Sequence, residues 1–157
     1  MKSEAANGGI APDSKIAETQ MVQSPGDFAM ALPFRGGRGA ASYDVTTPEG
    51  KAKMHRALHG ASKALKGVVG SVIEVEHVTL YPREFTLDDG EVREYVQVTF
   101  TSPTGEQWHT GSPHATGAAV TWSQMIGNPP WNPAQRFRVV ARPGSKGREF
   151  ITLEPEV

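Results

Sequence analysis

The chain has no cysteine among its 157 residues, which excludes disulfides, thiolate nucleophiles and cysteine-ligated zinc sites. It also has no long hydrophobic run, so no segment is suited to cross the roughly 30 Å hydrocarbon layer of a membrane as a helix. Residues 1–12 lack the apolar stretch of a secretion signal, and we therefore expect a cytoplasmic protein. The composition, 38% hydrophobic and 21% charged, supplies enough apolar material for one folded domain.

Charge is distributed unevenly, although the formal net charge is only −1. Residues 47–67 carry five basic side chains against Glu49, a charge of +4, whereas residues 68–106 carry two arginines against eight carboxylates, or −6. Residues 107–135 contain no Lys, Arg, Asp or Glu, and residues 136–157 return to +2. The near-neutral total thus conceals two basic patches and one acidic region.

The first 42 residues show no sustained helical or strand period and are rich in Gly, Ala, Ser and Pro. We therefore predict a flexible arm over residues 1–42. Within it, Phe28–Leu32 is apolar enough to dock on another surface. Arg35 and Arg38 lie among glycines as in RGG-type elements, whose guanidinium groups stack on bases and bind phosphates. A plain flexible linker accounts for the same residues equally well.

A basic helix is predicted over residues 47–66. Thr46 and Glu49 have the spacing of a capping box, and apolar residues recur at three- and four-residue steps as far as Leu65. Gly67 is the expected C-terminal stop. The apolar side of this helix should pack on the rest of the domain, with its lysines facing water or a polyanion.

Five strands and a second helix follow. The strands are predicted over residues 72–81, 92–101, 106–110, 135–141 and 148–153, and the helix over residues 115–126. Apolar alternation slips by one position within residues 72–81, which indicates a β-bulge and a bent strand. The resulting β-β-β-α-β-β order is that of the five-stranded OB barrel. We therefore predict a mainly β protein with an OB-like domain over residues 43–157, preceded by the extra helix and the arm; another small barrel, or a half-open sheet with a helix, is the alternative.

An OB barrel binds oligonucleotides on the outer surface of its second and third strands and on nearby loops. Rings and cations are needed there, because bases stack on aromatic faces while cations bind phosphates. In the second strand we expect Val96, Val98 and Phe100 to face inward, and Arg93, Tyr95, Gln97 and Thr99 to face outward. The candidate nucleic-acid-binding residues are Arg93, Tyr95, Trp108, Arg136, Arg138, Arg142, Lys146 and Arg148, with Arg35 and Arg38 of the arm. A structural alternative exists for each: the rings could pack into the protein, and the arginines could pair with Glu149 and Glu154.

The apolar face expected for the second helix consists of Ala118, Ala119, Trp122, Met125 and Ile126. Trp131, which follows two prolines, is expected to plug one end of the barrel. The acidic region should repel phosphate, so it should face away from DNA or recruit a partner protein.

No catalytic or metal-binding pattern stands out. His55 and His59 are four residues apart on the predicted first helix, but no third ligand is spaced nearby. Ser112 lies between His109 and His114 without the elbow motif of a serine nucleophile. We predict a protein without enzymatic activity, metal or cofactor.

Several short segments together resemble one known family. They are Gly70–Glu76, Met125–Gly127, Pro129–Pro133, Arg138–Ala141 and Gly147–Leu153. Over about residues 66–154 the chain is similar to single-stranded-DNA-binding proteins of tailed bacteriophages. This resemblance implies an OB fold that coats single-stranded DNA during phage replication or recombination, without catalysis, in the cytoplasm of the bacterial host.

The arm of residues 1–42 and the basic helix depart from that family pattern, which points to extra DNA contact or self-association. The acidic C-terminal tail that recruits replication proteins is represented only by Glu154–Val157. Single-stranded DNA is therefore the expected partner, with self-association or replication proteins as further possibilities. The alternative function is a β-barrel protein–protein interaction module, an adaptor or accessory phage component that uses Phe28–Leu32 and the acidic strand surface.

Overall fold

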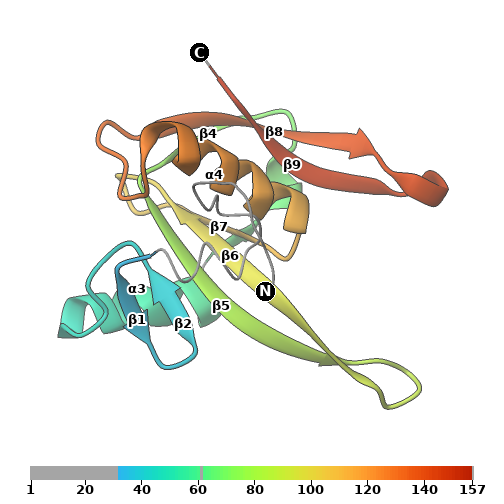
Figure 1. The fold of residues 1–157 in the computed structure, drawn as a ribbon, viewed down its shortest axis with the longest axis horizontal. Coiled ribbons are helices and arrows are strands. Elements are labelled where there is room, and N and C mark those ends of the chain that lie inside the picture. The colour runs from blue at the N-terminus through green and yellow to red at the C-terminus, as the bar shows by residue number, and fades with distance from the viewer. Residues whose placement is uncertain (1–31, 61, 157) are drawn as a thin grey trace, which may run out of the picture.

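The structure, a computed structural model, describes residues 32–60 and 62–156. The elements in chain order are β1 (Phe34–Gly36), β2 (Gly39–Ala41), α3 (Pro48–His59), β3 (Lys63–Ala64), the 3-10 turn η1 (Leu65–Val68), β4 (Val72–Val75), β5 (His77–Thr86), β6 (Val92–Thr101), β7 (Gln107–Thr110), α4 (Pro113–Ile126), β8 (Gln135–Pro143), the 3-10 turn η2 (Ser145–Gly147) and β9 (Glu149–Pro155). The strands form a larger sheet in the order β1-β2-β5-β6-β7-β3 and a smaller sheet in the order β4-β8-β9 (Figure 1). The described fold is thus mainly β, as predicted.

The segment predicted as one bent strand is two strands that belong to different sheets. Ile73 and Val75 of β4 have one parity, Val78 and Leu80 of β5 have the other, and all four side chains are buried. The chain changes sheets at Glu76, whose backbone N–H donates to Thr101 (2.8 Å) and whose carbonyl accepts from Trp131 (2.9 Å). The slip in apolar alternation therefore marks a sheet switch, because both halves of the segment must bury their apolar residues.

The described strands do not close into the predicted five-stranded barrel. The far edge of β7 pairs in parallel with β3, whereas β9 pairs only with β8. Two side-chain hydrogen bonds join β9 to the start of α4: Ser112 Oγ donates to the Ile151 carbonyl (2.6 Å), and Thr152 Oγ1 donates to the His114 carbonyl (3.2 Å). The order of strands and helix remains OB-like, with an open seam between β7 and β9.

Part of the predicted arm is ordered as the β1–β2 hairpin. β2 pairs with β5, and Ala40 and Ala41 are fully buried. Small residues permit this close approach: a Cβ on Gly39 would lie 2.7 Å from Met54 Cε and 2.8 Å from the Tyr81 ring. The prediction of a flexible arm is therefore wrong for residues 34–41. Residues 1–31, including most of the predicted docking segment, lie outside the described residues, and Leu32 is buried in the core.

The first helix is shorter than predicted. Its N-cap is Thr47, whose hydroxyl accepts from the Gly50 N–H at 3.0 Å. It ends at His59 rather than at residue 66, because the chain next forms β3 against β7 and then turns through η1. Leu65 is fully buried, but it belongs to η1 and not to the helix. Its helical spacing from the apolar residues of α3 is therefore coincidental, because the two segments are buried separately.

The second helix ends before Gly127, as predicted, but its buried face differs. Met125 is 69% exposed and Ile126 is 46% exposed, so both lie outside the core. The buried residues of α4 are Ala115, Thr116, Ala119, Val120 and Ser123. Among the described residues, no helix is long and apolar enough to span a membrane.

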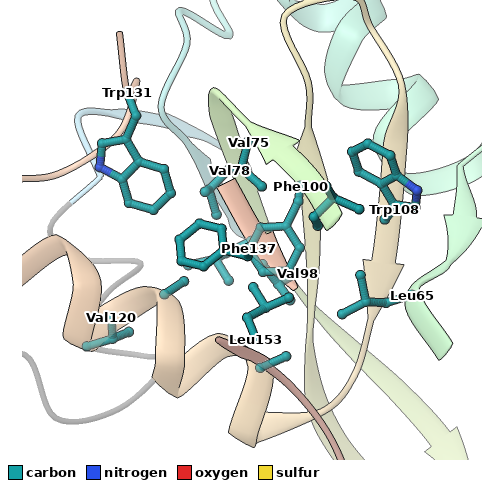
Figure 2. Close-up of a cluster of buried hydrophobic side chains, with 14 of the residues drawn as sticks. Leu65, Val75, Val78, Val98, Phe100, Trp108, Val120, Trp131, Phe137 and Leu153 are labelled. Atoms are coloured by element: carbon teal, nitrogen blue, oxygen red, sulfur yellow. The ribbon is translucent and has the colours of Figure 1, made fainter. Parts of the chain in front are cut away.

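The main core lies between the two sheets and α4. Figure 2 shows Phe100, Phe137 and Trp131, from three separate segments, pointing into it. The ring centroids of Trp131 and Phe137 are 6.0 Å apart, and Trp131 Nε1 donates to the Gly127 carbonyl at 2.8 Å. Trp131 is thus a structural residue.

Candidate nucleic-acid interface

The outer face of the larger sheet is covered at its centre by α3. Gln97 is 8% exposed and Thr99 is fully buried. Gln97 Nε2 and Thr99 Oγ1 donate to the Ala57 carbonyl of α3, at 3.3 and 3.0 Å. The prediction that these two side chains face outward to a ligand is wrong, because a helix occupies that face.

The same face is accessible where the β5–β6 hairpin extends past α3. Arg83 lies opposite Tyr95, and Phe85 opposite Arg93, in the strand register. Phe85 is 44% exposed, Tyr95 is 37% exposed, and their ring centroids are 5.8 Å apart. The predicted residues Arg93 and Tyr95 therefore share an exposed face with Phe85, which the sequence analysis missed although the parity of residues 81–85 carries the signal.

Close contacts fix the positions of Tyr95 and Arg83 in this hairpin. A Cβ on Gly111 would lie 2.9 Å from Tyr95 Cδ2, so the ring rests directly on the glycine backbone. Arg83 Nε donates to Gln97 Oε1 at 3.1 Å, and its Nη2 donates to the Leu58 carbonyl. Arg83 thus connects the hairpin to the end of α3.

A second aromatic pair lies at the tip of the β8–β9 hairpin. The rings of His114 and Phe150 are stacked, with centroids 3.9 Å apart and planes 27° apart. They line a hollow of about 210 Å³ together with Gly144, Ser145, Arg148 and Glu149. Lys146 and Arg148 are exposed and have no ion pair among the described residues. Arg148 thus lies beside two rings that were not among the predicted residues, and Lys146 is two positions before it in the same hairpin loop.

The two aromatic pairs meet at one short segment. Gly111 supports Tyr95 and His114 stacks on Phe150, and three residues of chain span at most about 11 Å. The hairpins β5–β6 and β8–β9 also project from the same side of the molecule (Figure 1). We call the four side chains Phe85, Tyr95, His114 and Phe150 the aromatic platform.

The arginines of β8 are largely paired with carboxylates. Arg138 donates to both oxygens of Glu156, at 2.9 and 3.2 Å, and Arg142 pairs with Glu154. The hydrogen bonds between Arg138 and Glu156 raise the pKa of the arginine and lower the pKa of the carboxyl. These partly exposed pairs contribute little to stability, but they balance charge that the sequence analysis assigned to DNA. Arg136 has no ion pair among the described residues.

The other predicted residues have mixed surroundings. Arg93 pairs with Glu91 at 3.1 Å, and Arg38 pairs with Glu94 at 2.8 Å. Arg35 is exposed on β1. Trp108 is 5% exposed and belongs to the core, so its structural alternative applies and we leave it out of the interface.

The acidic region forms the end of the β5–β6 hairpin, which we call the acidic tip. It comprises Glu84, Asp88, Asp89, Glu91 and Glu94, against Arg83 and Arg93. In the described part of the chain, no group of three or more His, Asp or Glu side chains is arranged to hold a metal ion. The Ser112 hydroxyl caps α4, where it accepts from the Ala115 N–H at 3.3 Å.

Residues 39–155 match the family model described as Phage Single-stranded DNA-binding protein. The chain belongs to this family. The family binds single-stranded DNA, so single-stranded DNA is the partner of the protein, and the resemblance seen in the sequence is confirmed. The matched range includes α3, so the basic helix lies inside the family region rather than outside it. No curated protein and no solved structure matches the chain.

Proposed function

We propose that the protein coats and protects single-stranded DNA during phage DNA replication or recombination, in the cytoplasm of the bacterial host and without catalysis. The observation that carries this proposal is that two solvent-accessible aromatic pairs lie next to residues 111–114, beside cations without ion pairs among the described residues. The DNA strand lies between the β5–β6 and β8–β9 hairpins, with its bases stacked on the aromatic platform. Lys146, Arg148 and Arg93 contact its phosphates, and Arg93 must exchange Glu91 for phosphate.

This arrangement supports binding with little sequence preference. Every base has a π-face, so stacking on rings tolerates any sequence, at about 1–3 kcal/mol per base. Cations that follow the backbone add a term that depends on salt and not on sequence. The remaining candidates, Arg35, Arg38, Arg136, Arg138 and Arg142, would contribute peripheral contacts, and Arg38, Arg138 and Arg142 only after they release their carboxylates.

A salt titration of oligo-dT binding and of duplex binding tests the proposal. If about four phosphates are neutralised, log K for the single strand falls by about 3 per tenfold increase in salt. We expect strong preference for oligo-dT over a duplex of equal length. Equal affinity for the two forms, or an affinity insensitive to salt, would overturn the proposal.

The acidic tip favours a second function, the recruitment of a protein partner. Its carboxylates repel phosphate and leave that end of the hairpin available to a basic surface of a replication protein or of another copy. Absence of oligo-dT binding at modest salt would make such an adaptor role the leading function.

A further inference from the structure

A DNA strand bound on the aromatic platform can continue over only some of the neighbouring surfaces. The centre of the sheet face is closed, because α3 covers Gln97 and Thr99 there. Away from the β8–β9 hairpin, the platform borders the acidic tip on one side. On the other side Arg83 and Gly111 connect it to α3 and η1. The backbone must therefore continue toward one of these two surfaces.

Electrostatics distinguishes the two exits. The acidic tip carries five carboxylates against two arginines, whereas residues 47–67 carry five cations against Glu49. A polyanion is repelled by the first surface and attracted by the second, and such potentials extend over about 8–10 Å at physiological salt. The exit toward α3 and η1 is the favourable one.

The cations on this side are available for phosphate. Lys51, Arg56 and Lys66 are exposed and have no ion pair among the described residues. The exposed face of α3 carries His55 and His59, whose ring centroids are 5.1 Å apart. At 100° per residue, Lys51 and Arg56 lie on either side of this histidine pair.

Lys66 places this surface beside the platform. It lines a hollow of about 220 Å³ together with His109, Gly111 and Ile151, and Gly111 is the residue on which Tyr95 rests. The other two cations of the region are already engaged: Lys53 lies over the Tyr43 ring at 4.8 Å, and Lys63 pairs with Glu106 at 3.7 Å. We call Lys51, Arg56 and Lys66 the basic shoulder.

We propose that single-stranded DNA leaving the aromatic platform is bound through its phosphates by the basic shoulder, a second contact surface that lengthens the binding site. This inference rests on the proposed function, since it places the first segment of the strand on the platform. In this proposal α3 has two roles. It covers the centre of the outer sheet face, and its exposed cations bind the phosphates of DNA that runs alongside it.

The test compares oligonucleotides of two lengths, about 5 and about 20 nucleotides, because single OB domains contact about 4–16. The variant K51Q/R56Q/K66Q removes the three charges, and K51R/R56K/K66R preserves them as the matched control. For the long oligo-dT we expect the salt slope of the triple-Gln variant to decrease by about 2, at about 0.7 per phosphate contact. Between 50 and 200 mM salt the wild-type protein would then lose about 20-fold more affinity than the variant.

The two controls separate the outcomes. The short oligonucleotide should bind the triple-Gln variant with little change, and the charge-preserving variant should retain the wild-type slope with both lengths. An unchanged slope for the triple-Gln variant on the long oligonucleotide overturns the basic shoulder but leaves the platform intact. If the wild-type protein binds neither oligonucleotide, the proposed function itself has failed.

Discussion

Replacing Tyr95 by alanine tests the aromatic platform most directly. The ring is 37% exposed, rests on Gly111 and lies 5.8 Å from the Phe85 ring, so it is oriented before DNA arrives. Loss of one stacked base costs about 1–3 kcal/mol, which corresponds to a 5- to 150-fold weaker Kd. Loss of the Tyr95–Phe85 pair lowers the free energy of unfolding by a further, separate 0.5–1.5 kcal/mol or so.

Fluorescence anisotropy of labelled oligo-dT at fixed salt measures the first effect, and thermal unfolding measures the second. Tyr95→Trp keeps an aromatic face and should retain most of the affinity. Val92→Ala is the matched control, because Val92 is a 57% exposed apolar residue of the same hairpin that belongs to neither aromatic pair. A Tyr95→Ala protein that is folded and binds oligo-dT as tightly as the wild type would refute the reasoning and remove Tyr95 from the interface.

Two further predictions concern the support of the ring and the response to acid. Gly111→Ala should weaken oligo-dT binding several-fold because its Cβ would lie 2.9 Å from Tyr95 Cδ2, whereas Gly117→Ala, where a Cβ meets no atom within 4 Å, should leave binding unchanged; equal affinities of the two variants would show that the glycine does not position the ring. Hydrogen bonds from Arg138 hold the pKa of Glu156 below its ordinary value of 4.5, so the stability they contribute is present above that pH and is lost as the pH falls through the lowered pKa. Unfolding midpoints of the wild type and of Glu156→Gln should therefore differ slightly at pH 7 and converge as the pH falls through the lowered pKa of Glu156, and a difference that stays constant during acidification would contradict the assignment.

Patterns that depend on neighbours in the sequence predicted their elements well. Strict alternation identified β6, and Gly127, at φ 104°, ends α4 because glycine adopts this backbone conformation without steric strain. The inward positions Val98 and Phe100 are fully buried as predicted. These features are local, so no knowledge of packing was needed.

Features that depend on tertiary contacts could not be obtained in this way. The outward residues Gln97 and Thr99 have the polarity of a solvated face, yet their polar atoms bond to a helix carbonyl. Alternation distinguishes the two faces of a strand, but it does not say whether water or a helix covers the polar one. The small residues of β1 and β2 resemble a linker for the same reason, since a closely packed hairpin and a flexible arm both favour Gly and Ala.

The candidate site was predicted in part. Tyr95 and Arg93 follow from strand parity, and Lys146 and Arg148 from their position beside a turn. His114 and Phe150 are 36 positions apart in the sequence, and only the fold stacks them. The ion pairs of Arg138 and Arg142 likewise depend on the register of β8 against β9.

The open seam between β7 and β9 has a mechanical consequence for the β5–β6 and β8–β9 hairpins, which flank the aromatic platform. In a closed barrel, moving one hairpin away from the other would break a continuous series of backbone hydrogen bonds. Here the polar links across the seam include the hydroxyl groups of Ser112 and Thr152, each worth about 1 kcal/mol. Separating the two hairpins therefore has a small polar cost, so in the proposed binding mode the site can widen for purines and narrow for pyrimidines.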